Sequence, residues 1–228
     1  MDKIKKFDEF INESVYDEND GFTSSVSGET PITKTPLPKK EVEGLRGQLI
    51  QISNCVKTII NGDEKEIEEI LGGNRAMMVC SMPGIGLTHS IEDGVSKSNG
   101  TEDDVFTIPD DFKINELLLY KSLYKYNNKL IVIEDFERIL DNYHCCKMLR
   151  RAMSDDRIIT FPRPVVEKDD IPAQFTFNGY IMLTSRMRIE ELMEKYKERL
   201  RTIRAKYELF NIFPDEKFKN TYVERERY

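Results

Sequence analysis

The sequence predicts an α/β protein in which a parallel sheet lies between two layers of helices. From residue 76 onward, short apolar runs alternate with segments whose apolar residues recur at helical spacing, a pattern typical of parallel sheets covered on both faces. The run 129–134 is continuous and rich in β-branched residues, which suits a central strand. A glycine-containing loop, 81–88, joins the first apolar run to a helix. The 228 residues, 39% of them hydrophobic, leave room for one such core.

Two helices are expected before the first strand. Apolar residues recur on one face of a helix that starts at Val42 and ends at Gly62. A second, charged helix ends at Leu71, before two consecutive glycines. Residues 1–40 differ in character, because a short amphipathic helix, suited to docking on a partner, precedes a stretch rich in Ser, Thr, Gly, Pro and acids. That stretch is expected to be a disordered linker.

The remaining elements are expected in alternation along the chain. The strands are 76–80, 104–108, 129–134, 179–184 and 207–212, and the helices are 88–97, 113–126, 142–153 and 189–203. The stretch 158–176 contains three prolines and is either a long loop or an irregular hairpin. The domain is expected to span residues 41–213, with 214–228 as a residual helix or tail.

Composition and charge exclude several classes of protein. No apolar run is long enough to span a bilayer, and we see no secretory signal. The four cysteines follow no metal-binding or disulfide spacing, which favours a reducing cytoplasm, and the adjacent Cys145 and Cys146 are expected to be packed thiols. A net charge of −7 argues against a general affinity for nucleic acid. The charged segment 188–206 is either a salt-bridged helix face or a basic edge for a neighbouring subunit or nucleic acid, formed by Arg199, Arg201, Arg204 and Lys206.

The loop 81–88 has the spacing of a phosphate-binding loop whose lysine is missing. It fits the strand–GxxxxGK[ST]–helix pattern, except that Ser81 replaces the first glycine and Leu87 replaces the lysine. Two glycines allow backbone N–H groups to turn toward a phosphate, and the helix N-terminus adds partial positive charge. The alternative is an ordinary glycine-rich turn. The candidate nucleotide-binding residues are Pro83, Gly84, Ile85, Gly86, Leu87, Thr88 and His89.

Acidic residues follow the run 129–134. In open parallel sheets, ligands bind beyond the carboxyl ends of the strands. Glu134 and Asp135 therefore stand where a phosphate-binding-loop protein holds Mg²⁺ and positions water, and Thr88 is the third candidate metal ligand. The alternative is a solvated acidic turn that also includes Glu137.

Four further segments, taken in order along the chain, resemble AAA-type P-loop ATPases, and in particular a small phage-encoded branch of them. The segment 119–129 resembles that branch's LYKxLYExxxKLIVF, and 130–140 resembles the Walker B region. Further along, 177–186 resembles the sensor-1 strand, and 203–212 resembles the segment that carries the arginine finger. The resemblance covers roughly residues 42 to 214. It implies a P-loop, three-layer parallel sheet with a C-terminal lid cut short after Pro214, and ATP and Mg²⁺ as cofactors. It also implies that Glu134, Asp135, Arg204 and Lys206 occupy catalytic positions.

The departures from that family pattern are the basis for the functional hypothesis. Leu87 replaces the Walker A lysine, Glu134 replaces an aspartate, Arg186 replaces the sensor asparagine, and Lys206 replaces the finger arginine. A charge-assisted contact is worth about 1.5–3 kcal/mol, so the loss of the lysine alone weakens binding roughly ten- to a hundredfold. The lysine also offsets charge on the transferred phosphoryl group. Weak nucleotide binding without efficient hydrolysis is therefore expected.

Three functions remain as hypotheses. The first is an AAA-like protein with impaired or absent ATP hydrolysis, which acts as a scaffold or regulatory partner of an active relative or of a second copy. The second is an active ATPase in which Lys97 or Lys206 supplies the missing charge and Asp135 polarises water. The third is a phage protein packaged in the virion, with a leader cleaved after the triplet 11–13. The first two imply the cytoplasm, which is that of the host cell if the protein is phage-encoded, the third implies the virion, and none implies a membrane.

Overall fold

The computed structural model describes residues 39–110, 114–162, 171–203 and 207–213. The expected N-terminal helix and linker, Arg204, Lys206 and the C-terminal tail therefore lie outside the described residues. The chain divides into two compact units, Met1–Gly47 with Pro214–Tyr228, and Gln48–Phe213. The helix α2 (Lys39–Asn61) begins in the first unit and continues into the second.

The second unit contains a five-stranded sheet in which every neighbouring pair of strands is parallel. Its strands are β1 (Ala76–Ser81), β2 (Val105–Ile108), β3 (Leu130–Ile133), β6 (Tyr180–Ser185) and β7 (Glu208–Ile212). Their order is β2-β3-β6-β1-β7. Each of the five expected strands forms within two residues of its expected bounds, so the α/β class with a parallel sheet is confirmed.

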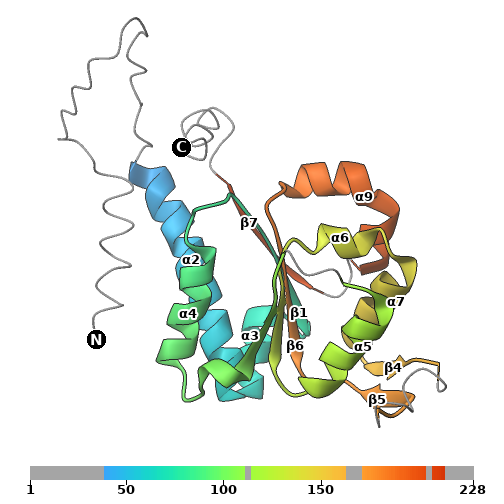
Figure 1. Cartoon of the computed structure of the whole chain (residues 1–228). Coiled ribbons are helices and arrows are strands. Elements are labelled where there is room, and N and C mark those ends of the chain that lie inside the picture. Colours follow the sequence, from blue (N-terminus) through green and yellow to red (C-terminus); the bar gives the residue numbers. More distant parts are fainter. Residues whose placement is uncertain (1–38, 111–113, 163–170, 204–206, 214–228) are drawn as a thin grey trace, which may run out of the picture. The chain divides into compact units, whose positions relative to one another are not determined.

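Helices cover both faces of this sheet. Within the second unit, α3 (Glu64–Leu71) and α4 (Leu87–Lys97) lie on one side together with α2, and α5 (Glu116–Lys125), α6 (Glu137–Leu140), α7 (Tyr143–Ala152) and α9 (Ile189–Ile203) lie on the other (Figure 1). The central strands are fully buried: every residue of β1, β3 and β6 is buried. Because successive side chains of a strand point to opposite faces, each of these strands supplies apolar side chains to two separate helical layers.

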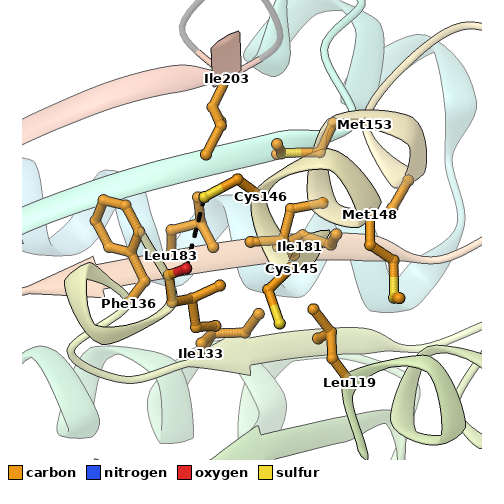
Figure 2. Close-up of a cluster of buried hydrophobic side chains, with 14 of the residues drawn as sticks. Leu119, Ile133, Phe136, Cys145, Cys146, Met148, Met153, Ile181, Leu183 and Ile203 are labelled. Atoms are coloured by element: carbon orange, nitrogen blue, oxygen red, sulfur yellow. Dashed lines mark hydrogen bonds between the residues drawn. The ribbon is translucent and has the colours of Figure 1, made fainter. Parts of the chain in front are cut away.

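The cysteines of α7 are part of the core on the α5–α9 side. Cys145 and Cys146 are buried among Leu119, Ile133 and Ile181, as Figure 2 shows. Burial raises the pKa of the Cys145 thiol to about 12. The expectation that these residues are packed thiols is confirmed.

Capping side chains account for small shifts in the helix starts. The helix expected at 113–126 begins at Glu116, because the Asn115 side chain accepts a hydrogen bond from the Leu118 N–H at 2.9 Å. Asn142 caps α7 in the same way, accepting from the N–H groups of His144 and Cys145. The stretch 158–176 contains a hairpin, in which β4 (Ile158–Thr160) pairs antiparallel with β5 (Gln174–Thr176). The short helix α6 was not expected.

The contact between α4 and α2 is close enough to require a glycine. A Cβ atom on Gly94 would lie 2.5 Å from the backbone oxygen of Ser53 and 2.7 Å from the Cβ of Val56. Beside it, the Ser53 hydroxyl donates a hydrogen bond of 2.6 Å to Asp93. This contact sets the position of α4, whose first turn ends the loop 81–88.

Candidate functional site

The strand order brings the predicted site elements to one edge of the sheet. β6 lies between β1 and β3, and all three strands are parallel, so their carboxyl ends share that edge. The loop 81–88 follows β1, the acids follow β3, and Arg186 follows β6. Cys80 pairs with Ser185 in the register of β1 and β6, which puts the backbone of Arg186 level with Ser81.

The backbone of the loop turns sharply between β1 and α4. Gly84 has a φ of 74° and Gly86 a φ of 95°, values in the left-handed region that glycine adopts without strain. The loop is anchored at both ends, since the Met82 N–H donates to the Ile212 carbonyl at 3.2 Å and the Ser90 N–H donates to the Gly86 carbonyl at 3.0 Å. No described residue accepts a hydrogen bond from the N–H groups of residues 84–88. This series of free donors at a helix N-terminus has the character of an anion-binding nest.

The side chains of the loop bring no positive charge to this nest. Leu87 is the first residue of α4 and is half-buried, and Thr88 beside it is exposed. The side chain of His89 is 43% exposed, and its Nδ1 lies 3.4 Å from a carboxylate oxygen of Glu92. The loop 81–88 contains no lysine or arginine. Its backbone therefore suits a phosphate, whereas its side chains lack the usual cation.

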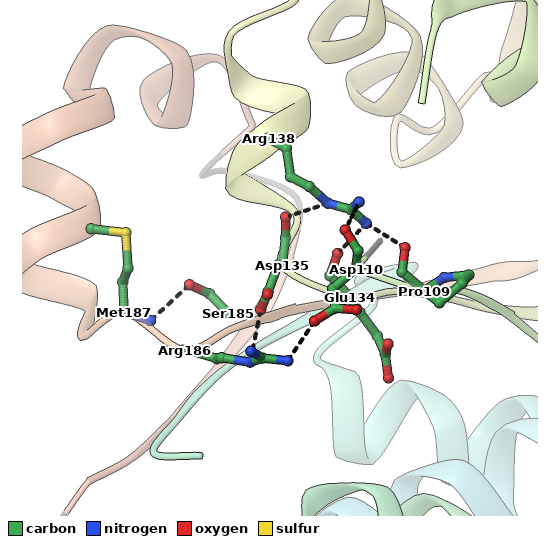
Figure 3. Close-up of polar contacts among 8 residues, drawn as sticks. All are labelled: Pro109, Asp110, Glu134, Asp135, Arg138, Ser185, Arg186 and Met187. Carbon is green, nitrogen blue, oxygen red and sulfur yellow. Dashed lines mark hydrogen bonds and ion pairs between the residues drawn. The ribbon is translucent and has the colours of Figure 1, made fainter. Parts of the chain in front are cut away.

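Asp135 is paired with an arginine from the neighbouring strand. Its backbone has a φ of 43°, and its Oδ1 lies 3.5 Å from the Nε of Arg186. Nη2 of the same guanidinium lies 2.6 Å from Oδ2 of Asp110, which follows β2 (Figure 3). The carboxylate predicted to polarise water thus forms an ion pair with Arg186. The Glu134 carboxylate, by contrast, forms no hydrogen bond or ion pair with the part of the chain that the structure describes.

Arg138 ties the ends of two strands together. After β2, its Nη2 donates to the carbonyl oxygen of Pro109 at 2.6 Å and its Nη1 donates to the carbonyl of Asp110. After β3, its Nη2 donates to the carbonyl oxygen of Glu134 at 2.9 Å and its Nε donates to that of Asp135 at 3.1 Å. These bonds hold the segments after β2 and β3 side by side (Figure 3). Neither Arg138 nor Asp110 was among the predicted site residues, although an acid two residues after an expected strand is a signal that could have found Asp110.

Glu137 also lies at this edge of the sheet, although it was not among the predicted catalytic or metal-binding residues. Its Oε2 is buried and has no hydrogen-bond partner among the described residues. Burial raises the pKa of this carboxyl, and the nearby Asp135 carboxylate raises it further. A hydrogen bond to Ser185 lowers the pKa and partly offsets this effect. The interpretation of residues 134–137 as a solvated acidic turn therefore fails at Glu137.

The lysine hypothesis is wrong for Lys97. This residue ends α4, and its Nζ lies 2.6 Å from Oδ2 of Asp93. At 1.5 Å per residue, it stands about 15 Å along the helix from Leu87, at the end remote from the loop. In α9, Arg201 pairs with Glu198 at 2.9 Å and the guanidinium of Arg199 stacks on Tyr143, contacts that favour a salt-bridged helix face over a free basic edge.

No group of three or more His, Cys, Asp or Glu side chains within the described ranges converges as a metal site. The metal set of Thr88, Glu134 and Asp135 stays a prediction. Among the helices that the structure describes, none has both the length and the apolar character needed to cross a bilayer.

Comparison with known proteins finds similarity in fold to solved structures. No protein-family model and no curated protein matches this sequence. The fold is similar to that of a solved structure of NtrX from Brucella abortus in complex with ATP, with a TM-score of 0.44 and 9% identity, over 88% of this chain and 40% of that one. The chain thus spans well under two thirds of that protein. At this degree of similarity, neither the ligand nor the family of NtrX is transferred to this chain.

Proposed function

We propose that this protein has an AAA-like, nucleotide-binding fold with impaired or absent ATP hydrolysis and acts as a scaffold or regulatory partner. The observation that carries the proposal is the loop 81–88, which has free backbone donors after a central strand and no cation among its side chains. Such a loop can bind a phosphate through its backbone N–H groups but lacks the lysine that contacts the β- and γ-phosphates.

The acids at the same edge support the loss of hydrolysis. A carboxylate that positions the attacking water must be free to accept its hydrogen bond. Asp135 is instead paired with Arg186, and it stands on the strand end that Arg138 holds to its neighbour. Both the charge stabilisation and the activation of water are therefore weakened.

The direct test is equilibrium binding of ATP–Mg²⁺ together with a hydrolysis assay, for the parent and for Leu87→Lys. Leu87→Met is the matched control, because it conserves volume and adds no charge. We expect Leu87→Lys to bind at least about tenfold more tightly than the parent and Leu87→Met to bind like the parent. Parent turnover above about 1 s⁻¹, the low end of ordinary enzymes, would show that the protein is a working ATPase.

The scaffold or regulatory role requires a partner, either a second copy of this chain or an active relative. Sedimentation of the purified full-length chain with and without ATP measures the first of these. A mass that is monomeric under both conditions would leave only a different protein as the partner. A stimulation or inhibition assay on an active relative would then test the role.

A further inference from the structure

Arg186 stands one strand away from the loop that lacks a cation. It directly follows β6, which pairs with β1 along the register from Ala76 with Ile181 to Cys80 with Ser185. Adjacent strands lie about 4.8 Å apart, a distance that an arginine side chain exceeds in length. Its guanidinium lies on the side of β3 and β2, where it contacts Asp135 and Asp110, and its side chain is 59% exposed at the edge of the sheet that the loop 81–88 also borders.

The guanidinium of Arg186 retains unused donors. Its Nη2 contacts Asp110 and its Nε contacts Asp135, but its Nη1 makes no hydrogen bond or ion pair with the described part of the chain. A guanidinium carries five N–H donors in a planar fork that matches phosphate oxygens. It can therefore bind a phosphate through its free side without leaving Asp135.

The existing contacts leave one side of the guanidinium accessible. The Arg186, Asp110 and Asp135 side chains are 59%, 37% and 23% exposed. A phosphate can therefore approach the free Nη1 side of the guanidinium while the pairs with Asp110 and Asp135 remain.

We propose that Arg186 supplies to a bound triphosphate the positive charge that Leu87 cannot, while it keeps Asp135 paired. This inference rests on the proposed function, because it concerns the same site. It explains how one substitution, an arginine at the end of β6, both permits binding and opposes hydrolysis. Arg186 is thus a binding residue toward the phosphates and a positioning residue toward Asp135.

The test is the binding of inorganic tripolyphosphate and of ATP to the full chain, measured by titration calorimetry for the parent, Arg186→Asn and Arg201→Asn. Arg201 is the matched control, since its side chain is 57% exposed and is also paired with a carboxylate, but in α9. We expect Arg186→Asn to lose roughly ten- to a hundredfold in affinity for both ligands and Arg201→Asn to bind like the parent. Thermal unfolding verifies that each variant is folded.

A rescue experiment separates a charge effect from a structural one. Adding Leu87→Lys to Arg186→Asn returns a cation to the loop, and we expect it to restore the lost affinity. Equal affinity of Arg186→Asn and the parent would refute the inference and leave the proposed function standing. The same holds if Leu87→Lys tightens binding in the parent but does not restore the affinity of Arg186→Asn, because the loss is then structural. Absence of any binding to the parent would refute the inference as well. Rapid hydrolysis by the parent, in contrast, overturns the proposed function through a different measurement.

Discussion

Replacing Gly94 by alanine should destabilise the protein, whereas the same change at Gly44 should stabilise it. A Cβ on Gly94 would meet three atoms of α2 closer than 3.0 Å: the Ser53 backbone oxygen at 2.5 Å and two carbons of Val56 at 2.7 and 2.9 Å. The backbone oxygen cannot turn away, so α4 must shift from α2. Such overpacking costs about 1–3 kcal/mol, and three close contacts put this site at the upper end of that range. Alanine regains about 1 kcal/mol of helix propensity, which leaves a net loss of roughly 1–2 kcal/mol.

Gly44 is the matched control because it also lies inside a helix, α2, yet a Cβ there meets nothing within 4 Å. The substitution should add about 0.5–1 kcal/mol of stability through the backbone alone. Urea unfolding at 25 °C, followed by circular dichroism, measures both changes as shifts of the midpoint at constant slope. If Gly94→Ala is as stable as the parent or more stable, the close approach of α4 and α2 is wrong.

Three further predictions concern the site and the core. Arg138→Met should lower the free energy of unfolding by about 2–4 kcal/mol in the same urea assay, because several charge-assisted hydrogen bonds to backbone carbonyls are lost. A loss below about 0.5 kcal/mol, which is typical of surface positions, would contradict this prediction. Glu137→Gln should become more stable relative to the parent as the pH rises above 4.5. The pKa of Glu137 is higher in the folded than in the unfolded protein, so the parent loses stability as the pH rises from the ordinary pKa to the folded one. A stability difference that does not vary between pH 4 and 8 would count against this prediction. Burial raises the pKa of Cys55 to about 11 and of Cys80 to about 12. At pH 8 these thiols of the native protein should therefore react with a thiol-specific disulfide reagent only as fast as the protein unfolds. Rapid labelling of the native protein would exclude such burial.

The elements of the fold could be predicted from sequence because their signals are local. The run 129–134 contains enough consecutive apolar residues to define a buried strand, and β3 forms within it. Helix starts were less predictable, because Asn115 and Asn142 act through only one and two side-chain hydrogen bonds, respectively. The helix α6 was missed since four residues show no periodicity.

The polar contacts of the site could not be predicted in the same way. Asp110 and Arg186 are 76 residues apart, and they meet only because the strand order sets β3 beside both β2 and β6. Nothing in the local pattern specifies that order. The burial of Glu137 depends on packing from several elements, whereas the nearby acids Glu134 and Asp135 suggested an exposed acidic turn.

The position of β1 in the sheet has a consequence for how the chain is made on the ribosome. β1 is the first strand to emerge, yet the two strands that flank it, β6 and β7, are the last two. Until translation reaches them, the nascent chain carries an apolar strand with both edges open, a form prone to aggregation. Folding of the sheet is therefore completed only when the last strand has left the exit tunnel.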